Sequence, residues 1–153
     1  MKKLKPYILG LTITFSAIAF ITFQLSVYTV DTSLRDWKND FDGYIKTTSM
    51  QMASTKPVAI FFYTDWCVNC KKLREEILAA PMVKEFVSEN FLAVKINPEN
   101  GKLENQLSKE FGVIGYPSFF VSTNDGKNTI RIKKTSNISP EEFINQLKFA
   151  IKS

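Results

Sequence analysis

The first strong feature of the chain is an apolar run close to its beginning. Residues 7–30 carry no charged side chain, Lys2, Lys3 and Lys5 precede them, and Asp31 ends the run. An α-helix of this length reaches roughly 36 Å, more than the hydrocarbon layer of a membrane at about 30 Å. Because short basic flanks stay in the cytoplasm, we expect residues 1–30 to be a signal anchor that exports everything after them. Cleavage of a signal peptide after Ala17–Ile18–Ala19 is the alternative.

The next two segments predict a linker with one helix and then a buried strand. Residues 31–55 are polar and mixed, and their apolar residues Leu34, Trp37, Phe41 and Ile45 recur at helical spacing. Pro57 breaks this pattern and opens Val58–Tyr63, an unbroken apolar run. Such a run is typical of a central strand that is covered on both faces.

The remaining pattern predicts alternating helices and strands. Ser139 is a good helix N-cap because Pro140, Glu141 and Glu142 follow it. The last two strands should pair as an antiparallel hairpin, since Asn124–Gly126 is a turn signal. We therefore expect one α/β domain over residues 56–153. Its elements after the first strand are helices over 67–79 and, beyond a kink at Pro81, through 87; a strand over 91–96; a helix over 102–111; strands over 117–122 and 129–133; and a closing helix with Phe143, Ile144, Leu147 and Ile151 as its apolar stripe.

Composition narrows the chemistry. With 153 residues, 44% hydrophobic and 23% charged, the chain fits one core plus a short appendage. There is no histidine, which excludes histidine bases and most catalytic zinc sites. The net charge is +5, but the lysines outside the N-terminus are scattered, so we expect no nucleic-acid binding.

The two cysteines form a C-x-x-C motif at the junction of the first strand and the helix after it. At a helix start, Cys67 faces unpaired backbone N–H groups and the positive end of the helix dipole, which favour its thiolate. Cys67 is therefore the expected attacking sulfur, and the more shielded Cys70 is expected to resolve the mixed disulfide. A structural disulfide, a zinc site and an inert pair stay open as alternatives, although a disulfide here closes a tiny loop and zinc needs more ligands.

Two strings around this motif resemble a known family. Trp66–Lys71 and Val113–Ser118 are similar to the active-site and proline loops of the thioredoxin superfamily. Together with Lys56–Val58, the stretch Asp65–Lys71 more closely resembles the C-terminal periplasmic domain of the DsbD family of thiol:disulfide interchange proteins, over roughly residues 36–150. The resemblance implies a thioredoxin fold, a central mixed β-sheet flanked by helices.

The resemblance also implies roles for residues near the cysteines. Pro117 would be a cis-proline that faces the disulfide, a geometry that only X-Pro bonds reach at low cost. Trp66 and the backbone of Tyr116 would contact the substrate. The residues expected to modulate the cysteines are Asp65, Val68, Asn69 and Lys71.

Two positions depart from the family pattern. Where relatives often carry buried acids, six residues before and seven residues after Cys67, this chain has Phe61 and Arg74. Glu75 or Glu76 would substitute as proton acceptor if the helix turned them inward. The positive charges at Lys71, Lys72 and Arg74 should favour the Cys67 thiolate, partly opposed by Asp65.

The expected function is that of a single-pass protein of a bacterial inner membrane with a periplasmic thiol:disulfide oxidoreductase domain. It would be a reductase or electron carrier that acts on oxidised proteins and receives electrons from a membrane donor protein, with the redox disulfide as its only cofactor and no metal. A disulfide oxidase or isomerase, a thioredoxin for cytochrome c maturation, and a non-catalytic thioredoxin-like binding module are the alternatives.

Overall fold

The apolar run after Pro57 forms the centre of the sheet. The computed structural model describes residue 34 and residues 36–153. In it, β2 (Val58–Phe62) is buried at every position. β2 pairs in parallel with β3 (Leu92–Ile96) and antiparallel with β4 (Ser118–Thr123). The predicted central strand is therefore confirmed.

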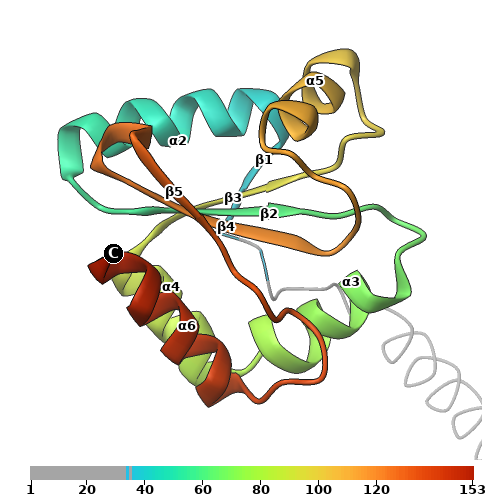
Figure 1. The fold of residues 1–153 in the computed structure, drawn as a ribbon, viewed down its shortest axis with the longest axis vertical. Coiled ribbons are helices and arrows are strands. Elements are labelled where there is room, and N and C mark those ends of the chain that lie inside the picture. Colours follow the sequence, from blue (N-terminus) through green and yellow to red (C-terminus); the bar gives the residue numbers. More distant parts are fainter. Residues whose placement is uncertain (1–33, 35) are drawn as a thin grey trace, which may run out of the picture. The chain divides into compact units, whose positions relative to one another are not determined.

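Two short strands complete a five-stranded mixed sheet with the order β1-β3-β2-β4-β5 (Figure 1). β1 (Lys38–Asn39) runs parallel to β3, with Lys38 opposite Val94. β5 (Asn128–Arg131) runs antiparallel to β4, so the predicted hairpin is confirmed. Its connection is a 3₁₀ turn over Asn124–Gly126.

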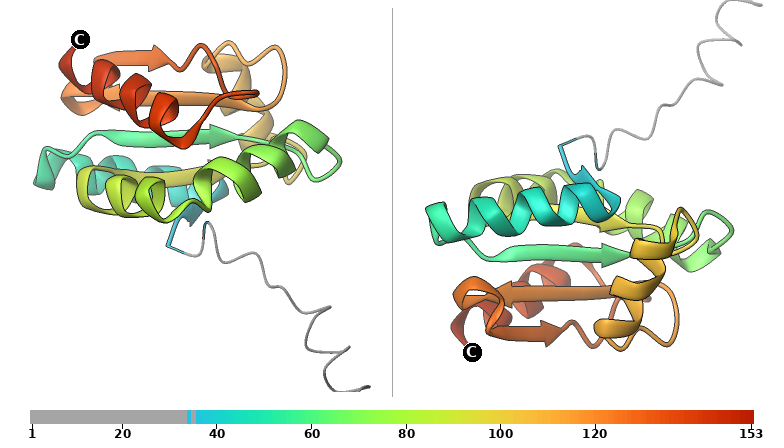
Figure 2. Two further views of the ribbon diagram at one scale, coloured as in Figure 1. Left: turned by 90° about the horizontal axis from the view of Figure 1, so that it is seen from below. Right: turned by 90° about the horizontal axis from the view of Figure 1, so that it is seen from above.

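Helices cover both faces of this sheet, as the two views of Figure 2 show. One face of β2 and β4, which presents Ala59, Phe61, Phe119 and Val121, packs against the helices that carry Cys70, Val83 and Phe143. The opposite face packs against the helices that carry Tyr44 and Leu107. The helices of the first group are α3 (Val68–Lys72), the π-helical η1 (Leu73–Leu78), α4 (Pro81–Asn90) and α6 (Pro140–Lys152), and those of the second are α2 (Asp40–Ser54) and α5 (Lys102–Glu110).

Aromatic rings fill the core beneath the first group of helices. The ring of Phe119 lies 6.1 Å from that of Phe61 and 5.2 Å from that of Phe143, measured between centroids. These three side chains are fully buried. Such rings bury large apolar areas, so this stack anchors α6 to the sheet.

The apolar stripe expected along the first helix is wrong. Leu34 and Trp37 lie in a turn before β1, closed by the hydrogen bond from Trp37 N to Leu34 O at 3.2 Å, and Ile45 is exposed. The buried residues of α2 are instead Gly43, Thr47 and Gln51. Burying the two polar ones is tolerated because Thr47 Oγ1 donates to Gly43 O at 2.7 Å and Gln51 Nε2 donates to Ser122 O at 2.9 Å.

The other helices follow the sequence with smaller differences. The break near Pro81 is present, and Pro81 begins α4. Ser139 caps α6, since its Oγ accepts from Glu142 N at 3.1 Å. At the end of α6, Ala150 is buried where Ile151 was expected. The stretch expected as one α-helix from residue 67 is divided into α3 and the π-helical η1.

Residues 7–30, the predicted membrane anchor, lie outside the described residues. Within residue 34 and residues 36–153, no helix has the length and apolar character needed to cross a membrane.

Candidate active site

The cysteine pair, Cys67 and Cys70, lies where the loop after β2 enters α3. The two residues form a disulfide with an S–S distance of 2.09 Å and a Cα–Cα distance of 5.2 Å. Cys67 is the N-cap residue of α3, in extended backbone conformation, and its N–H donates to Thr64 O at 3.2 Å. The apolar strand β2 ends before the polar residues Thr64 and Asp65. The helix α3 then begins, and its first backbone N–H groups have no partner within the helix.

The helix start directs a hydrogen-bond donor at the first sulfur. Cys70 N lies 3.1 Å from Cys67 Sγ and donates to it. Cys67 is 6% exposed and Cys70 is 1% exposed, so Cys67 is the more accessible sulfur of the two. This order of exposure matches the expected division into an attacking and a resolving cysteine.

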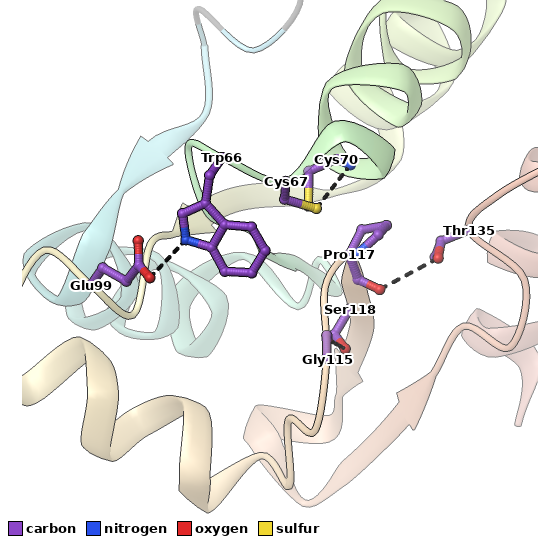
Figure 3. Close-up of a disulfide and its surroundings, with 8 residues drawn as sticks. All are labelled: Trp66, Cys67, Cys70, Glu99, Gly115, Pro117, Ser118 and Thr135. Atoms are coloured by element: carbon purple, nitrogen blue, oxygen red, sulfur yellow. Dashed lines mark hydrogen bonds between the residues drawn. A yellow bond between two sulfur atoms is a disulfide. The ribbon is translucent and has the colours of Figure 1, made fainter.

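The proline loop faces the cysteine pair. The Tyr116–Pro117 peptide bond is cis, the geometry that the resemblance implies, and Figure 3 shows Pro117 opposite the disulfide. Two hydroxyls hold the loop, since Ser118 Oγ donates to Gly115 O at 2.7 Å and Thr135 Oγ1 approaches Pro117 O at 3.5 Å. The cis-proline and the disulfide, far apart in the sequence, are thus brought together by β4 lying beside β2.

Apolar side chains flank both loops and remain open to solvent. Trp66 is 67% exposed, Val68 78% and Ile114 91%, whereas Tyr116 is half-buried. The indole of Trp66 meets the ring of Tyr116 edge-on, with centroids 6.3 Å apart. We call Trp66, Val68, Ile114 and Tyr116 the apolar rim. Exposed apolar groups of this kind, next to a reactive disulfide, suit binding of a polypeptide.

Sequence reasoning missed two members of this region. Ile114 lies within Val113–Ser118, but its apolar character does not indicate that it is exposed. Glu99 follows β3, and its Oε1 accepts from Trp66 Nε1 at 2.8 Å. No local motif connects Glu99 to Trp66, because the contact depends on β3 lying beside β2.

The residues expected to modulate the cysteines surround them on the surface. Asp65 is exposed, and its Oδ2 accepts from Asn97 Nδ2 at 3.2 Å. Val68 and Asn69 occupy the first turn of α3 between the two cysteines, and both are exposed. Lys71 Nζ lies 3.9 Å from Glu75 Oε1, one turn further along the helix.

Comparison with known proteins identifies the fold family. A family model of the thioredoxin-like domain matches residues 46–151. The chain belongs to this family. Among curated relatives, the thiol:disulfide interchange protein DsbD of Neisseria meningitidis serogroup B is 34% identical over 83 residues, which are 54% of this chain but 14% of that protein. The disulfide bond reductase DsbH of Chlamydia pneumoniae is 26% identical over 101 residues, covering 60% of this chain and 61% of that one.

Solved structures give the same relationship. The oxidised C-terminal domain of Neisseria meningitidis DsbD is 25% identical, with a TM-score of 0.58, and the match covers 74% of this chain and 98% of that domain. A DsbH oxidoreductase, 22% identical, shares the fold with a TM-score of 0.66 over 76% of this chain and 83% of that one. The relatives are thioredoxin-like disulfide oxidoreductases, and this chain carries the same type of C-x-x-C disulfide.

At the two positions where acids were expected by resemblance, this thioredoxin-like domain has an apolar ring and a cation. Phe61 is fully buried in β2 and stacks on Tyr63, with centroids 5.5 Å apart. Arg74 is half-buried, and its guanidinium carbon lies 5.8 Å from the centre of the Tyr63 ring. Burial raises the pKa of the Tyr63 hydroxyl, and the charges of Asp40 and Asp65 raise it further, while Arg74 lowers it. Tyr63 therefore stays protonated near neutral pH.

Glu75 and Glu76 do not replace the missing acids. Both side chains are exposed, and Glu76 Oε2 lies 3.9 Å from Lys72 Nζ, as Glu75 does from Lys71. The helix thus turns them to solvent, since i,i+4 partners share one face of a helix. The idea that either glutamate reaches inward to Cys70 is wrong for this structure.

Proposed function

We propose that the chain is a dithiol reductase or electron carrier that reduces disulfides in proteins outside the cytoplasm. The observation that carries the proposal is the Cys67–Cys70 disulfide at the start of α3, opposite the cis-bonded Pro117, in a thioredoxin fold. The name of one relative, the disulfide bond reductase DsbH of Chlamydia pneumoniae, supports this direction of electron flow. So does the pair Val68–Asn69 between the cysteines, because it contains no histidine that would strongly lower the pKa of the attacking cysteine, as in strong oxidants.

The reaction follows from the two sulfurs. The Cys67 thiolate attacks one sulfur of a substrate disulfide, so that a mixed disulfide forms and one substrate thiolate leaves. Cys70 then loses its proton and attacks Cys67 Sγ, which releases the second substrate sulfur and forms the Cys67–Cys70 disulfide. Two electrons pass from the protein dithiol to the substrate, and a separate donor must restore the dithiol.

The structure offers each step a specific group. The N–H of Cys70, which lies 3.1 Å from Cys67 Sγ in the disulfide, is in position to donate to a Cys67 thiolate and so favour its charged form. The apolar rim and the backbone at Tyr116 would receive the polypeptide around the substrate disulfide. No metal or organic cofactor enters these steps, because the electrons reside on sulfur throughout.

Membrane attachment is a further part of the proposal. The uncharged residues 7–30 and the lysines before them support a single anchor with the thioredoxin-like domain on the periplasmic side of a bacterial inner membrane. One such anchor carries no cysteine of its own, so we propose that a membrane electron-donor protein delivers the electrons to Cys67–Cys70.

Two serine variants test the chemistry in the full-length chain. With dithiothreitol as donor and insulin as the oxidised protein, we expect Cys67→Ser to abolish the catalysed reduction of insulin and to leave only the direct reaction with dithiothreitol. Cys70→Ser, reduced and then freed of dithiothreitol before it meets insulin, should accumulate a mixed disulfide at Cys67, visible as a heavier band that reductant removes, because the resolving sulfur is missing.

The outcome also separates the rival readings. Insulin reduction by Cys67→Ser at the wild-type rate would contradict the proposal. If the double variant lacking both sulfurs kept the biological activity of the chain, a binding module without turnover would replace the reductase.

A further inference from the structure

Glu99 holds the largest side chain of the apolar rim in place. Trp66 Nε1 donates to Glu99 Oε1 at 2.8 Å, and Figure 3 shows the indole between Glu99 and the cysteine pair. Trp66 is 67% exposed, so little packing holds its side chain. This hydrogen bond and the edge-on contact with Tyr116 are therefore important for its orientation. Without the hydrogen bond, an exposed indole would sample several rotamers.

Glu99 is itself fixed by a buried amide. Asn97 is 1% exposed, its Oδ1 accepts from Glu99 N at 3.0 Å, and its Nδ2 donates to Asp65 Oδ2 at 3.2 Å. The backbone N–H of Asn97 donates to Asp40 Oδ1 at 3.1 Å, at the start of α2. One buried side chain thus ties the loop that carries Glu99 to the residue directly before Trp66.

The Glu99 carboxylate also places a negative charge beside the rim. Burial raises the pKa of the Tyr116 hydroxyl, and the negative charge of Glu99 raises it further. On the helix side, the charges of Lys71 and Lys72 are offset by Glu75 and Glu76. Asp65 adds to the negative charge next to Trp66, and Asn97 Nδ2 is a neutral donor.

We propose that Glu99 both positions Trp66 and sets substrate preference, so that the chain favours disulfides whose neighbouring residues include lysine or arginine on the Trp66 side. This inference rests on the proposed reductase function. A single exposed ion pair of this kind changes affinity by a small factor, roughly 1.5- to 5-fold. Added salt should weaken the preference, because the groups are exposed to solvent.

The experiment compares two synthetic peptides that each carry one disulfide and differ only in two flanking residues, both lysine or both glutamate. With dithiothreitol as electron donor and its direct reaction subtracted, the kcat/KM for each peptide is measured with the full-length chain at about 0.01 M and about 1 M ionic strength. Glu99→Gln keeps an oxygen acceptor for the indole but removes the charge, whereas Glu99→Ala removes both. Glu85→Gln, on the exposed face of α4, is the matched control for loss of one negative charge.

At low salt, we expect the kcat/KM of the wild type and of Glu85→Gln to be roughly 1.5- to 5-fold higher for the lysine peptide, mainly through a lower KM. Glu99→Gln should lose this preference. Glu99→Ala should also raise KM for both peptides and lower the emission anisotropy of Trp66, read in a Trp37→Phe background that leaves one indole. Equal use of both peptides by the wild type would overturn the preference, and unchanged Trp66 anisotropy in Glu99→Ala would overturn the positioning. If neither peptide were reduced, the proposed function itself would fail.

Discussion

At the scale of residues, the proposed reduction of disulfides depends on what stabilises the thiolate of Cys67. The helix start and the Cys70 N–H act on its sulfur from one side. At the two positions where the resemblance implied acids, the chain has Phe61, which is buried in an aromatic stack, and the cationic Arg74. The helix start, the Cys70 N–H and the positive charge of Arg74 favour a charged sulfur at Cys67, whereas the apolar Phe61 adds no charge, since a cation and a hydrogen bond to the anion lower a thiol pKa.

The first prediction concerns this pKa. In the reduced protein we expect Cys67 to titrate below the ordinary thiol value of about 8.5, so that its alkylation by iodoacetamide stays fast as the pH falls below that value. Arg74→Gln should raise the Cys67 pKa because it removes a half-buried cation, four residues beyond Cys70, in the helical segment η1 that follows α3. Lys84→Gln, which removes one exposed positive charge from α4, is the control and should change little. A wild-type pKa at or above about 8.5 would contradict this part of the account.

Much of the candidate site was visible in the sequence at this scale. The C-x-x-C motif, its place at a strand-to-helix junction and Pro117 could all be read from two short strings. Glu99, Asn97 and Ile114 could not, because their roles arise from contacts across neighbouring strands or from exposure. Glu75 and Glu76 were ambiguous in sequence, and only their pairing with Lys71 and Lys72 decided that they face solvent.

At the scale of elements, the apolar runs of the sequence predicted the central strands and most helices. The sequence did not predict which polar side chains are buried. β2 and β4 are buried strands with strong β-forming residues, and they were found. β1 has two polar residues and joins the sheet only by pairing with β3, so it carries no pattern of its own. In α2, the buried Thr47 and Gln51 look like surface residues until their hydrogen-bond acceptors are known.

A second prediction tests how α6 is attached to the sheet. Phe143 is fully buried against Phe119, whereas Phe149 on the same helix is 71% exposed. Phe143→Ala should therefore lower the free energy of unfolding by about 3–5 kcal/mol, because it leaves a cavity in the core. Phe149→Ala should change it by less than about 0.5 kcal/mol. Urea unfolding followed by circular dichroism measures both, and equal losses in the two variants would contradict the described packing.

At the scale of the whole molecule, we propose that residues 7–30, which lie outside the described residues, anchor the thioredoxin-like domain to a membrane. We predict that the full-length chain stays in the membrane fraction after washing with alkaline carbonate. Protease added to spheroplasts should digest the domain. Protease added to inverted membrane vesicles should not, because the domain is then enclosed inside the vesicle. A shortened product released into the periplasm would instead indicate a cleaved signal peptide.

The measurement that tests the central claim most directly is the reduction potential of the Cys67–Cys70 pair. The full-length chain in detergent is equilibrated with glutathione or dithiothreitol buffers, and the fraction of disulfide is read after acid quenching and alkylation. A reductase should have a potential near or below about −230 mV, in the range of thioredoxin-type reductants. A value between about −180 and −120 mV would contradict the reductase and favour an oxidase or isomerase.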